Sequence, residues 1–383
     1  MAVKTLGWVP SELGMIPEGW SVRPLKDLAE FRKGSGLPKK EIVSSGGSYP
    51  CIHYGELFTH YGADIDTVTS RTNRCDYSSR SRTSDVLMPT SDVTPTGLAK
   101  ASCIKDENVI LGSDILVIRC DPKAICGSYL SRTIRWDRHQ VLGLVSGSTV
   151  FHLYGSSMAS FRLRVPPLPE QRAIAEALAD GEAYIAALDE LLAKKRDIFY
   201  AARNLLLSAR GGGWRRKRLG ELLAVRHGKS QWNVLDLHGS VPILGTGGQV
   251  GWASRAMYDR PSVLIGRKGT IDAPQYIDVP FWTIDTLFYT HMQDDTDAEF
   301  MYHVFSRIPW ITYNEASGVP SLNASTIEAI EVDVPEGGEQ RRIAAILHDF
   351  QAEIAALEAQ KDKASLIKQG MMQELLTGKT RLV

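Results

Sequence analysis

The sequence predicts an α+β protein in which one plan, a mixed-sheet domain followed by a long helix, occurs twice. A segment that starts at Val165 recurs at Val334, 169 residues later, and each copy opens a heptad pattern. The stretches 1–165 and 211–334 are rich in Gly, Ser, Thr and Tyr and contain short apolar runs typical of strands. A repeat with a fixed offset indicates an internal duplication.

The duplicated unit is one domain together with the helix that follows it. The domains are predicted over 1–165 and 211–334, and the helices, with the C-terminal tail, over 166–210 and 335–383. The domain entries correspond as well: the matching pairs are Gly19-Trp20 with Gly213-Trp214, and Lys33-Gly34 with His227-Gly228. The plan is therefore two mixed α/β globular domains separated by two long helices.

The heptad pattern predicts that the two helices pack along one apolar stripe as a left-handed coiled coil. Each pattern runs over roughly 38 residues, whereas helices of globular domains average about 11 to 12, so two ordinary core helices are the weaker alternative. Two related units favour a self-complementary contact about a pseudo-two-fold axis. The predicted seam is Ile174, Leu178, Ile185, Leu188, Leu192, Phe199 and Leu206 in the first helix, and Ile343, Leu347, Phe350, Ile354, Leu357, Met371 and Leu375 in the second.

Composition limits the possible functions but does not identify one. The net charge is zero and 23% of residues are charged, so no global basic signal indicates nucleic acid. Residues 1–165 hold 20 Lys and Arg against 16 Asp and Glu, whereas 211–334 hold 11 against 14. The five cysteines show no metal-ligand or redox spacing. Without a leader pattern or a long apolar run, we expect a cytoplasmic protein with no membrane partner.

Polar loops that follow apolar strands are the candidate binding sites. If the ligand is DNA, base reading needs side chains with hydrogen-bonding groups on a surface that reaches the groove. The first domain offers Arg71, Arg74, Arg80 and Arg82, then Thr90, Ser91 and Thr94 after a strand, and the second offers Arg267, Lys268 and Thr270 after 263–265. The basic run 215–218 is a further candidate. Solvent-exposed connections are the alternative for all of these, and phosphate contact is the alternative to base readout.

No catalytic motif stands out, although an enzyme is the competing class. The loop 245–251 has the wrong spacing for dinucleotide binding. Asp114, Asp121 and Lys123 resemble a nuclease trio only in composition, and Asp121-Pro122 is typical of a turn. We therefore expect this chain to be non-catalytic, with no metal site of its own.

Four motifs together make the chain resemble the DNA-specificity (S) subunit of Type I restriction-modification enzymes. They are Ile16-Pro17-Glu18-Gly19-Trp20, the run Pro167-Leu168-Pro169-Glu170-Gln171-Arg172, the strand and loop 263–270, and the ending 375–382. The resemblance covers essentially the whole chain. The second helix departs from the pattern, because Glu336-Gly337-Gly338 stands where the first has Pro167-Leu168-Pro169.

The resemblance implies an antiparallel coil and a chain that binds double-stranded DNA. It implies that each domain reads one half of a bipartite target, and that the helices set the spacer and dock two methyltransferase subunits. Restriction subunits would join in the full complex. S-adenosylmethionine, ATP and Mg²⁺ would be used by those partners, and no cofactor would be bound by this chain. A related methylation-only or defence system is the alternative.

Overall fold

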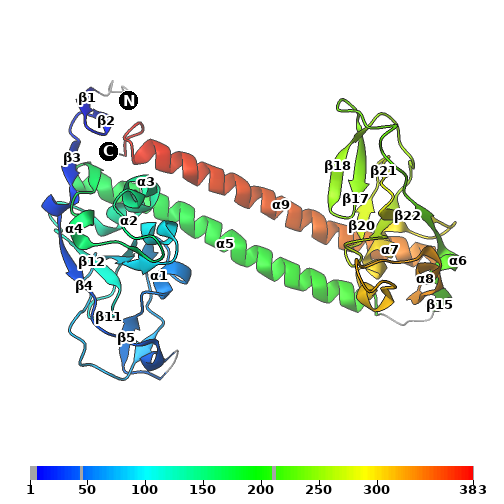
Figure 1. Ribbon diagram of the computed structural model, residues 1–383, viewed down its shortest axis with the longest axis horizontal. Coiled ribbons are helices and arrows are strands. Elements are labelled where there is room, and N and C mark those ends of the chain that lie inside the picture. The colour runs from blue at the N-terminus through cyan, green and yellow to red at the C-terminus, as the bar shows by residue number, and fades with distance from the viewer. Residues whose placement is uncertain (1–6, 44–45, 209–212, 383) are drawn as a thin grey trace. The chain divides into compact units, whose positions relative to one another are not determined.

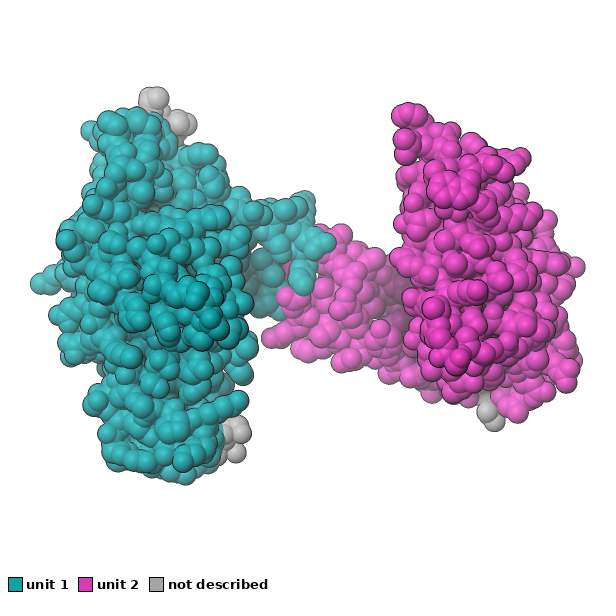
Figure 2. Space-filling model, in the orientation of Figure 1, with its two compact units in different colours: residues 1–187, 361–383 teal, residues 188–360 magenta. Residues whose placement is uncertain are grey.

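The computed structural model describes residues 7–43, 46–208 and 213–382. It divides into two compact units, one formed by 1–187 with 361–383 and the other by 188–360 (Figure 2). Each unit contains sheets, short helices and a part of both long helices (Figure 1). The predicted boundary between 210 and 211 lies outside the described residues. The α+β class is confirmed.

The first unit is built on a five-stranded sheet in the order β4-β12-β8-β10-β6. One face carries Met88, Leu116 and Ile118 against the short helices, and the other carries Leu87 and Val117 against a smaller sheet, β11-β5-β7. The strands of these sheets are β4 (Ala29–Lys33), β5 (Tyr49–Ile52), β6 (Asp64–Ile65), β7 (Arg71–Thr72), β8 (Val86–Pro89), β10 (Ser102–Ile104), β11 (Ile110–Leu111) and β12 (Ile115–Cys120).

Short pairs and helices complete this unit. The strand pairs are β1 (Trp8–Ser11) with β2 (Gly14–Pro17), β3 (Ser21–Pro24) with β14 (Arg162–Val165), and β9 (Ser91–Asp92) with β13 (Phe151–His152). The helices are α1 (Glu56–Thr59), α2 (Gly127–Trp136), α3 (Arg138–Leu142) and α4 (Gly155–Met158).

The second unit repeats this arrangement with fewer strands. Its sheets have the orders β16-β22-β19-β20, β18-β17-β21 and β15-β23, and the strand directions match those of the first unit. The strands are β15 (Arg215–Arg218), β16 (Leu223–His227), β17 (Val241–Gly245), β18 (Gly248–Ala253), β19 (Ser262–Gly266), β20 (Gln275–Ile277), β21 (Trp282–Thr283), β22 (Leu287–Met292) and β23 (Glu331–Val334). The short helices are α6 (Leu219–Leu222), α7 (Ala298–Phe305) and α8 (Ala324–Ala329).

The two long helices, α5 (Leu168–Leu206) and α9 (Gly337–Leu375), each contain 39 residues. In the first unit Leu178 packs with Leu375, and Glu182 Oε1 lies 3.6 Å from Lys368 Nζ. Because later residues of α5 meet earlier residues of α9, the helices run antiparallel, as predicted. Every predicted seam residue is buried or half-buried. Within the described residues, no helix has the length and apolarity needed to span a membrane.

Candidate nucleic-acid interface

Thr90 follows the buried strand β8 and has both backbone groups hydrogen-bonded. Its N–H donates to the carbonyl of Asp114 at 2.9 Å, and its carbonyl accepts from the N–H of Leu153 at 3.0 Å. Ser91 pairs with His152 across β9 and β13, and its Oγ lies 3.0 Å from His152 Nδ1. A main chain held in this way fixes where the side chains point. Thr90, Ser91 and His152 line a depression of ≈ 490 Å³.

Arg267 occupies the same place in the second unit. Its N–H donates to the carbonyl of Thr286 at 2.8 Å, and its carbonyl accepts from the N–H of Leu322 at 3.0 Å. The next residue, Lys268, forms an isolated bridge with Ser321, as Ser91 pairs with His152. The two predicted loops are therefore equivalent in backbone structure, although one presents two hydroxyls and the other two cations.

The remaining residues of these loops lie at the surface. Thr94 is exposed, and its hydroxyl donates to Asp92 Oδ2 at 2.9 Å. Lys268 and Thr270 are exposed, whereas Arg267 is half-buried and donates through Nη1 to the carbonyl of Asp285 at 3.2 Å. The second loop thus offers an exposed ammonium beside a partly engaged guanidinium.

Two of the four predicted arginines of the first domain are held by polar contacts to an earlier segment of that domain, at Glu41, Gly47 and Ser48. Arg71 donates to two backbone carbonyls at 2.5 and 3.0 Å. Arg74 pairs with Asp76 and, at 3.0 Å, with Glu41. The hydrogen bonds to these carboxylates raise the pKa of Arg74 above its usual value. These side chains stabilise the loop, so the sequence prediction that all four arginines face DNA gains no support from their contacts.

The guanidinium of Arg80 is held by hydrogen bonds, whereas that of Arg82 is exposed. Arg80 donates to the carbonyls of Asn108 and Cys75, both at 3.1 Å. Arg82 is exposed, and its guanidinium has no ion pair within the described part of the chain. Its backbone N–H is fixed by Asp85 Oδ2 at 2.9 Å. Arg82 is therefore a free charge on an ordered turn.

The basic run 215–218 lies in strand β15 rather than in a loop. Arg216 donates to both carboxylate oxygens of Asp333 on β23, at 3.1 and 3.0 Å. One of its four cations is thus paired across a two-stranded sheet.

Several basic residues near the predicted loops were not singled out from the sequence. Arg32 and Lys33, at the end of β4, line the depression next to Thr90, and Arg226 and His227 occupy the same register positions on β16. In the sequence, the repeated pairs Lys33-Gly34 and His227-Gly228 were the feature that could have identified these basic residues. They indicated the duplication, but nothing in the sequence placed them beside the loops.

Three sequence motifs meet in one buried cluster of the first unit. The fully buried carboxylate of Glu170 accepts from Trp20 Nε1 at 3.0 Å and from Arg381 Nη2 at 2.6 Å. The guanidinium of Arg381 also lies over the Trp20 ring, 5.5 Å from its centroid. The domain entry, the start of α5 and the C-terminal tail are thereby joined.

The glutamine of each repeated segment attaches its helix to its domain. Gln171 Oε1 accepts from the N–H of Cys126, the residue before α2, at 2.8 Å. Gln340 Oε1 accepts from the N–H of Asp297, the residue before α7, at 3.0 Å. Both side chains also donate, at 2.9 Å, to the carbonyl of the proline five residues before them. The motif is structural, and it is used in the same way in both halves.

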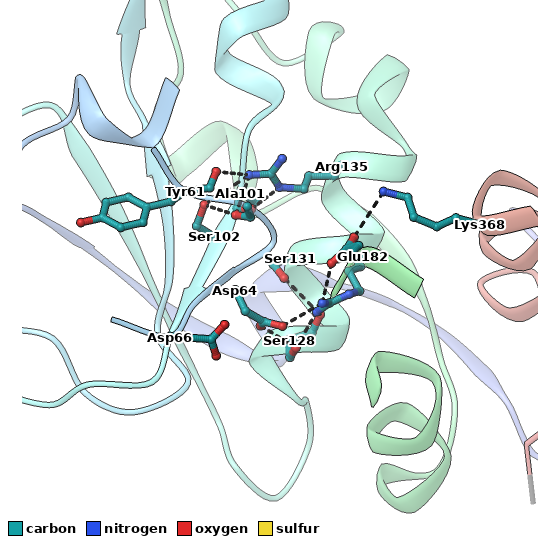
Figure 3. A network of polar contacts seen from close by, with 12 residues as sticks. Tyr61, Asp64, Asp66, Ala101, Ser102, Ser128, Ser131, Arg135, Glu182 and Lys368 are labelled. Carbon is teal, nitrogen blue, oxygen red and sulfur yellow. Dashed lines mark hydrogen bonds and ion pairs between the residues drawn. The ribbon is translucent and has the colours of Figure 1, made fainter. Parts of the chain in front are cut away.

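A second polar network joins the first domain to both long helices (Figure 3). Arg132 on α2 is buried and pairs with Asp64 at 2.8 Å and with Glu182 of α5 at 2.7 Å. Glu182 in turn pairs with Lys368 of α9. Desolvation opposes the charged form of Arg132, but its carboxylate partners hold its pKa above the usual value.

The fold and this geometry define a duplicated protein in which each domain presents ordered polar loops at one end of a sheet. A family model, the Type I restriction modification DNA specificity domain, matches residues 17–194 and 212–366. The chain belongs to this family of DNA-binding specificity subunits of restriction-modification systems.

Solved structures agree with the fold. The S subunit of a Type I restriction-modification system from M. genitalium is 15% identical, with a TM-score of 0.69 over 93% of this chain and 96% of that chain. A structure described as the basis of complex assembly and conformational transition of the type I R-M system is 16% identical, with a TM-score of 0.53 over 95% and 99%.

Proposed function

We propose that this chain reads a bipartite DNA target, with one domain on each half, and that α5 and α9 set the length of the unread spacer. The observation that carries the proposal is the identical anchoring of Thr90 and Arg267. Each follows the central strand of its sheet with both backbone groups hydrogen-bonded. Rigid presentation of different side chains from one scaffold suits two half-sites of different sequence, because specificity comes from contacts to base edges.

The chemistry would then belong to partner subunits. Two methyltransferase subunits would dock on the helices and use S-adenosylmethionine, and restriction subunits would add ATP- and Mg²⁺-dependent cleavage. A methylation-only or other defence system is the second candidate, since it would need the same DNA-reading chain. Support for assembly comes from family membership and from the fold shared with a structure of a type I R-M complex. We expect all of this in the cytoplasm.

Exchanging the second domain tests whether the halves read independently. Replacing 211–334 by the corresponding domain of another family member should change one half-site and leave the other half-site and the spacer intact. The reason is that each domain has its own sheet, loops and glutamine attachment. Methylome sequencing of cells that express the chimaera with a methyltransferase partner gives the answer. Alteration of both half-sites would contradict independent reading.

Inserting four residues after Ala193 tests whether the coil sets the spacer. The insertion adds about 6 Å of helix and rotates the remainder of α5 by roughly 40° from a whole turn, which a coiled coil can absorb by local unwinding. We expect the spacer to lengthen by about one or two base pairs, at roughly 3.4 Å each, with both half-sites unchanged. A methylome with the original spacer would show that the distance is set elsewhere.

A further inference from the structure

A basic groove in the first domain lies beside the predicted loop. It has a volume of ≈ 530 Å³ and is lined by Arg32, Lys33, Arg80, Arg82 and Arg119. Its other lining residues are three serines, an asparagine and a valine, so no carboxylate lines it. Cations and hydroxyl groups around an open groove have the chemistry that binds a phosphate, through charge and through hydrogen bonds.

A buried ion pair holds the wall of this groove in place. Asp85 is 1% exposed, and it accepts from Arg119 Nε at 3.1 Å and from Arg119 Nη2 at 2.8 Å. The same carboxylate accepts from the backbone N–H of Arg82, and Arg119 also donates to the carbonyl of Arg80 at 3.0 Å. The turn that carries Arg80 and Arg82 is therefore ordered before any ligand arrives, which lowers the entropic cost of binding.

Two of the five cations are available for an anion. Lys33 and Arg82 are both exposed, and neither side chain has an ion pair among the residues that the structure describes. Arg32 pairs with Glu30 at 3.0 Å, but both side chains are more than half exposed, and such pairs are weak. Arg119 is mostly buried and is held by Asp85 and by the carbonyl of Arg80, so it positions the wall rather than receiving the ligand.

The second domain fills the corresponding space with aromatic rings. Strand register places Tyr289 and His291 on β22 where β12 has Val117 and Arg119. Tyr258 covers them: its hydroxyl oxygen lies 2.9 Å from His291 Nδ1, and its ring centroid lies 5.2 Å from that of Tyr289. Phe281 completes the cluster, 5.7 Å from Tyr258. Where the first domain has the wall residue Arg119 and an open groove, the second domain therefore has rings that pack on one another.

We propose that this groove of the first domain binds the DNA backbone without regard to sequence, and that the second domain has no equivalent phosphate-binding groove. The two domains then contribute differently to DNA binding. The first supplies most of the salt-dependent affinity, and the second contributes mainly base selection. The local charges agree, since 1–165 has more Lys and Arg than Asp and Glu and 211–334 has fewer. This inference rests on the proposed function, because it assumes that the ligand is DNA.

The test is the salt dependence of DNA binding by the full chain in complex with its methyltransferase partner. The probes are a duplex with the methylome-defined target and a scrambled duplex of the same length. The double variant Lys33→Ala/Arg82→Ala should bind both duplexes more weakly, with a slope of log affinity against log salt that is less steep by about two, roughly 0.9 for each phosphate contact. The methylated sequence should stay the same.

Three further double variants control for charge removal, for folding and for the difference between the domains. Lys26→Ala/Lys123→Ala removes two exposed charges beyond the other end of β4 and should leave the slope unchanged. The charge-preserving pair Lys33→Arg/Arg82→Lys should keep the wild-type slope. Arg226→Ala/His227→Ala, at the corresponding place in the second domain, should change the slope by less than about one unit, since it removes at most one phosphate contact.

Three outcomes would overturn the inference. They are an unchanged slope for Lys33→Ala/Arg82→Ala, an equal loss of slope in the second-domain pair, or a changed half-site in the methylome of the first pair. Each of these leaves the proposed function standing. Failure of the wild-type complex to prefer the target duplex over the scrambled one would instead remove the proposed function itself.

Discussion

Replacing Glu170 by alanine is expected to destabilise the first unit by about 3 kcal/mol, the cost of breaking a buried ion pair by removing one partner. The carboxylate of Glu170 is fully buried and is the shared acceptor for Trp20 and Arg381. Without it, the largely buried guanidinium of Arg381 loses its counter-charge. Urea unfolding followed by circular dichroism should show a lower midpoint for this unit.

The second half supplies the matched control. Glu339 stands at the position of Glu170 in the repeated segment, but it pairs with Arg342 at the protein surface. The side chain of Glu339 is 39% exposed and that of Arg342 is 59% exposed. Exposed pairs contribute little, so Glu339→Ala should leave the free energy of unfolding nearly unchanged. Equal effects of the two substitutions would show that the Glu170 cluster does not join the motifs energetically.

Replacing Gly34 by alanine should also be severe, because there is no room for a side chain at the end of β4. A Cβ at Gly34 would lie 1.8 Å from the carbonyl oxygen of Gly112, a backbone atom that cannot rotate away. Overpacking typically costs about 1 to 3 kcal/mol, and here the strand end must move. Since Lys33 is the preceding residue, we expect DNA affinity to fall together with stability.

Replacing Gly36 by alanine is the control, because it removes a glycine without creating a steric clash. A Cβ at Gly36 meets nothing within 4 Å, so Gly36→Ala should unfold at the wild-type urea concentration and bind DNA normally. Comparing the two variants by urea unfolding and by fluorescence anisotropy with the target duplex measures both effects. If Gly34→Ala were as stable as Gly36→Ala, the close approach of Gly34 to the backbone of Gly112 would not be required.

The duplication and the long helices could be predicted from the sequence. Seam residues such as Leu178 and Leu347 repeat every seven positions, and the pattern ends within a few residues of the observed helix ends. The polar strand ends at Thr90 and Arg267 could be predicted from it as well. These features are local, because a period or a strand followed by polar residues can be read from consecutive positions.

The sequence was insufficient wherever the partner of a charge is distant in the chain. Arg74 is a predicted DNA-binding residue, and nothing in the sequence indicated that its guanidinium pairs with Glu41, 33 residues away. Arg119 was not singled out, because its role depends on Asp85 across the sheet. The filling of the second domain by Tyr258 and Tyr289 likewise follows from strand register. Which of the predicted residues contact DNA stays a prediction.

The attachment of each domain through Gln171 or Gln340 constrains how such proteins can diversify. In the domain, the contact uses a backbone N–H, at Cys126 in one case and Asp297 in the other, and does not involve the side chain there. Any residue except proline presents the same donor. This hydrogen bond therefore does not depend on which side chain stands at position 126 or 297, so either residue can be exchanged for any except proline without loss of the contact to the helix.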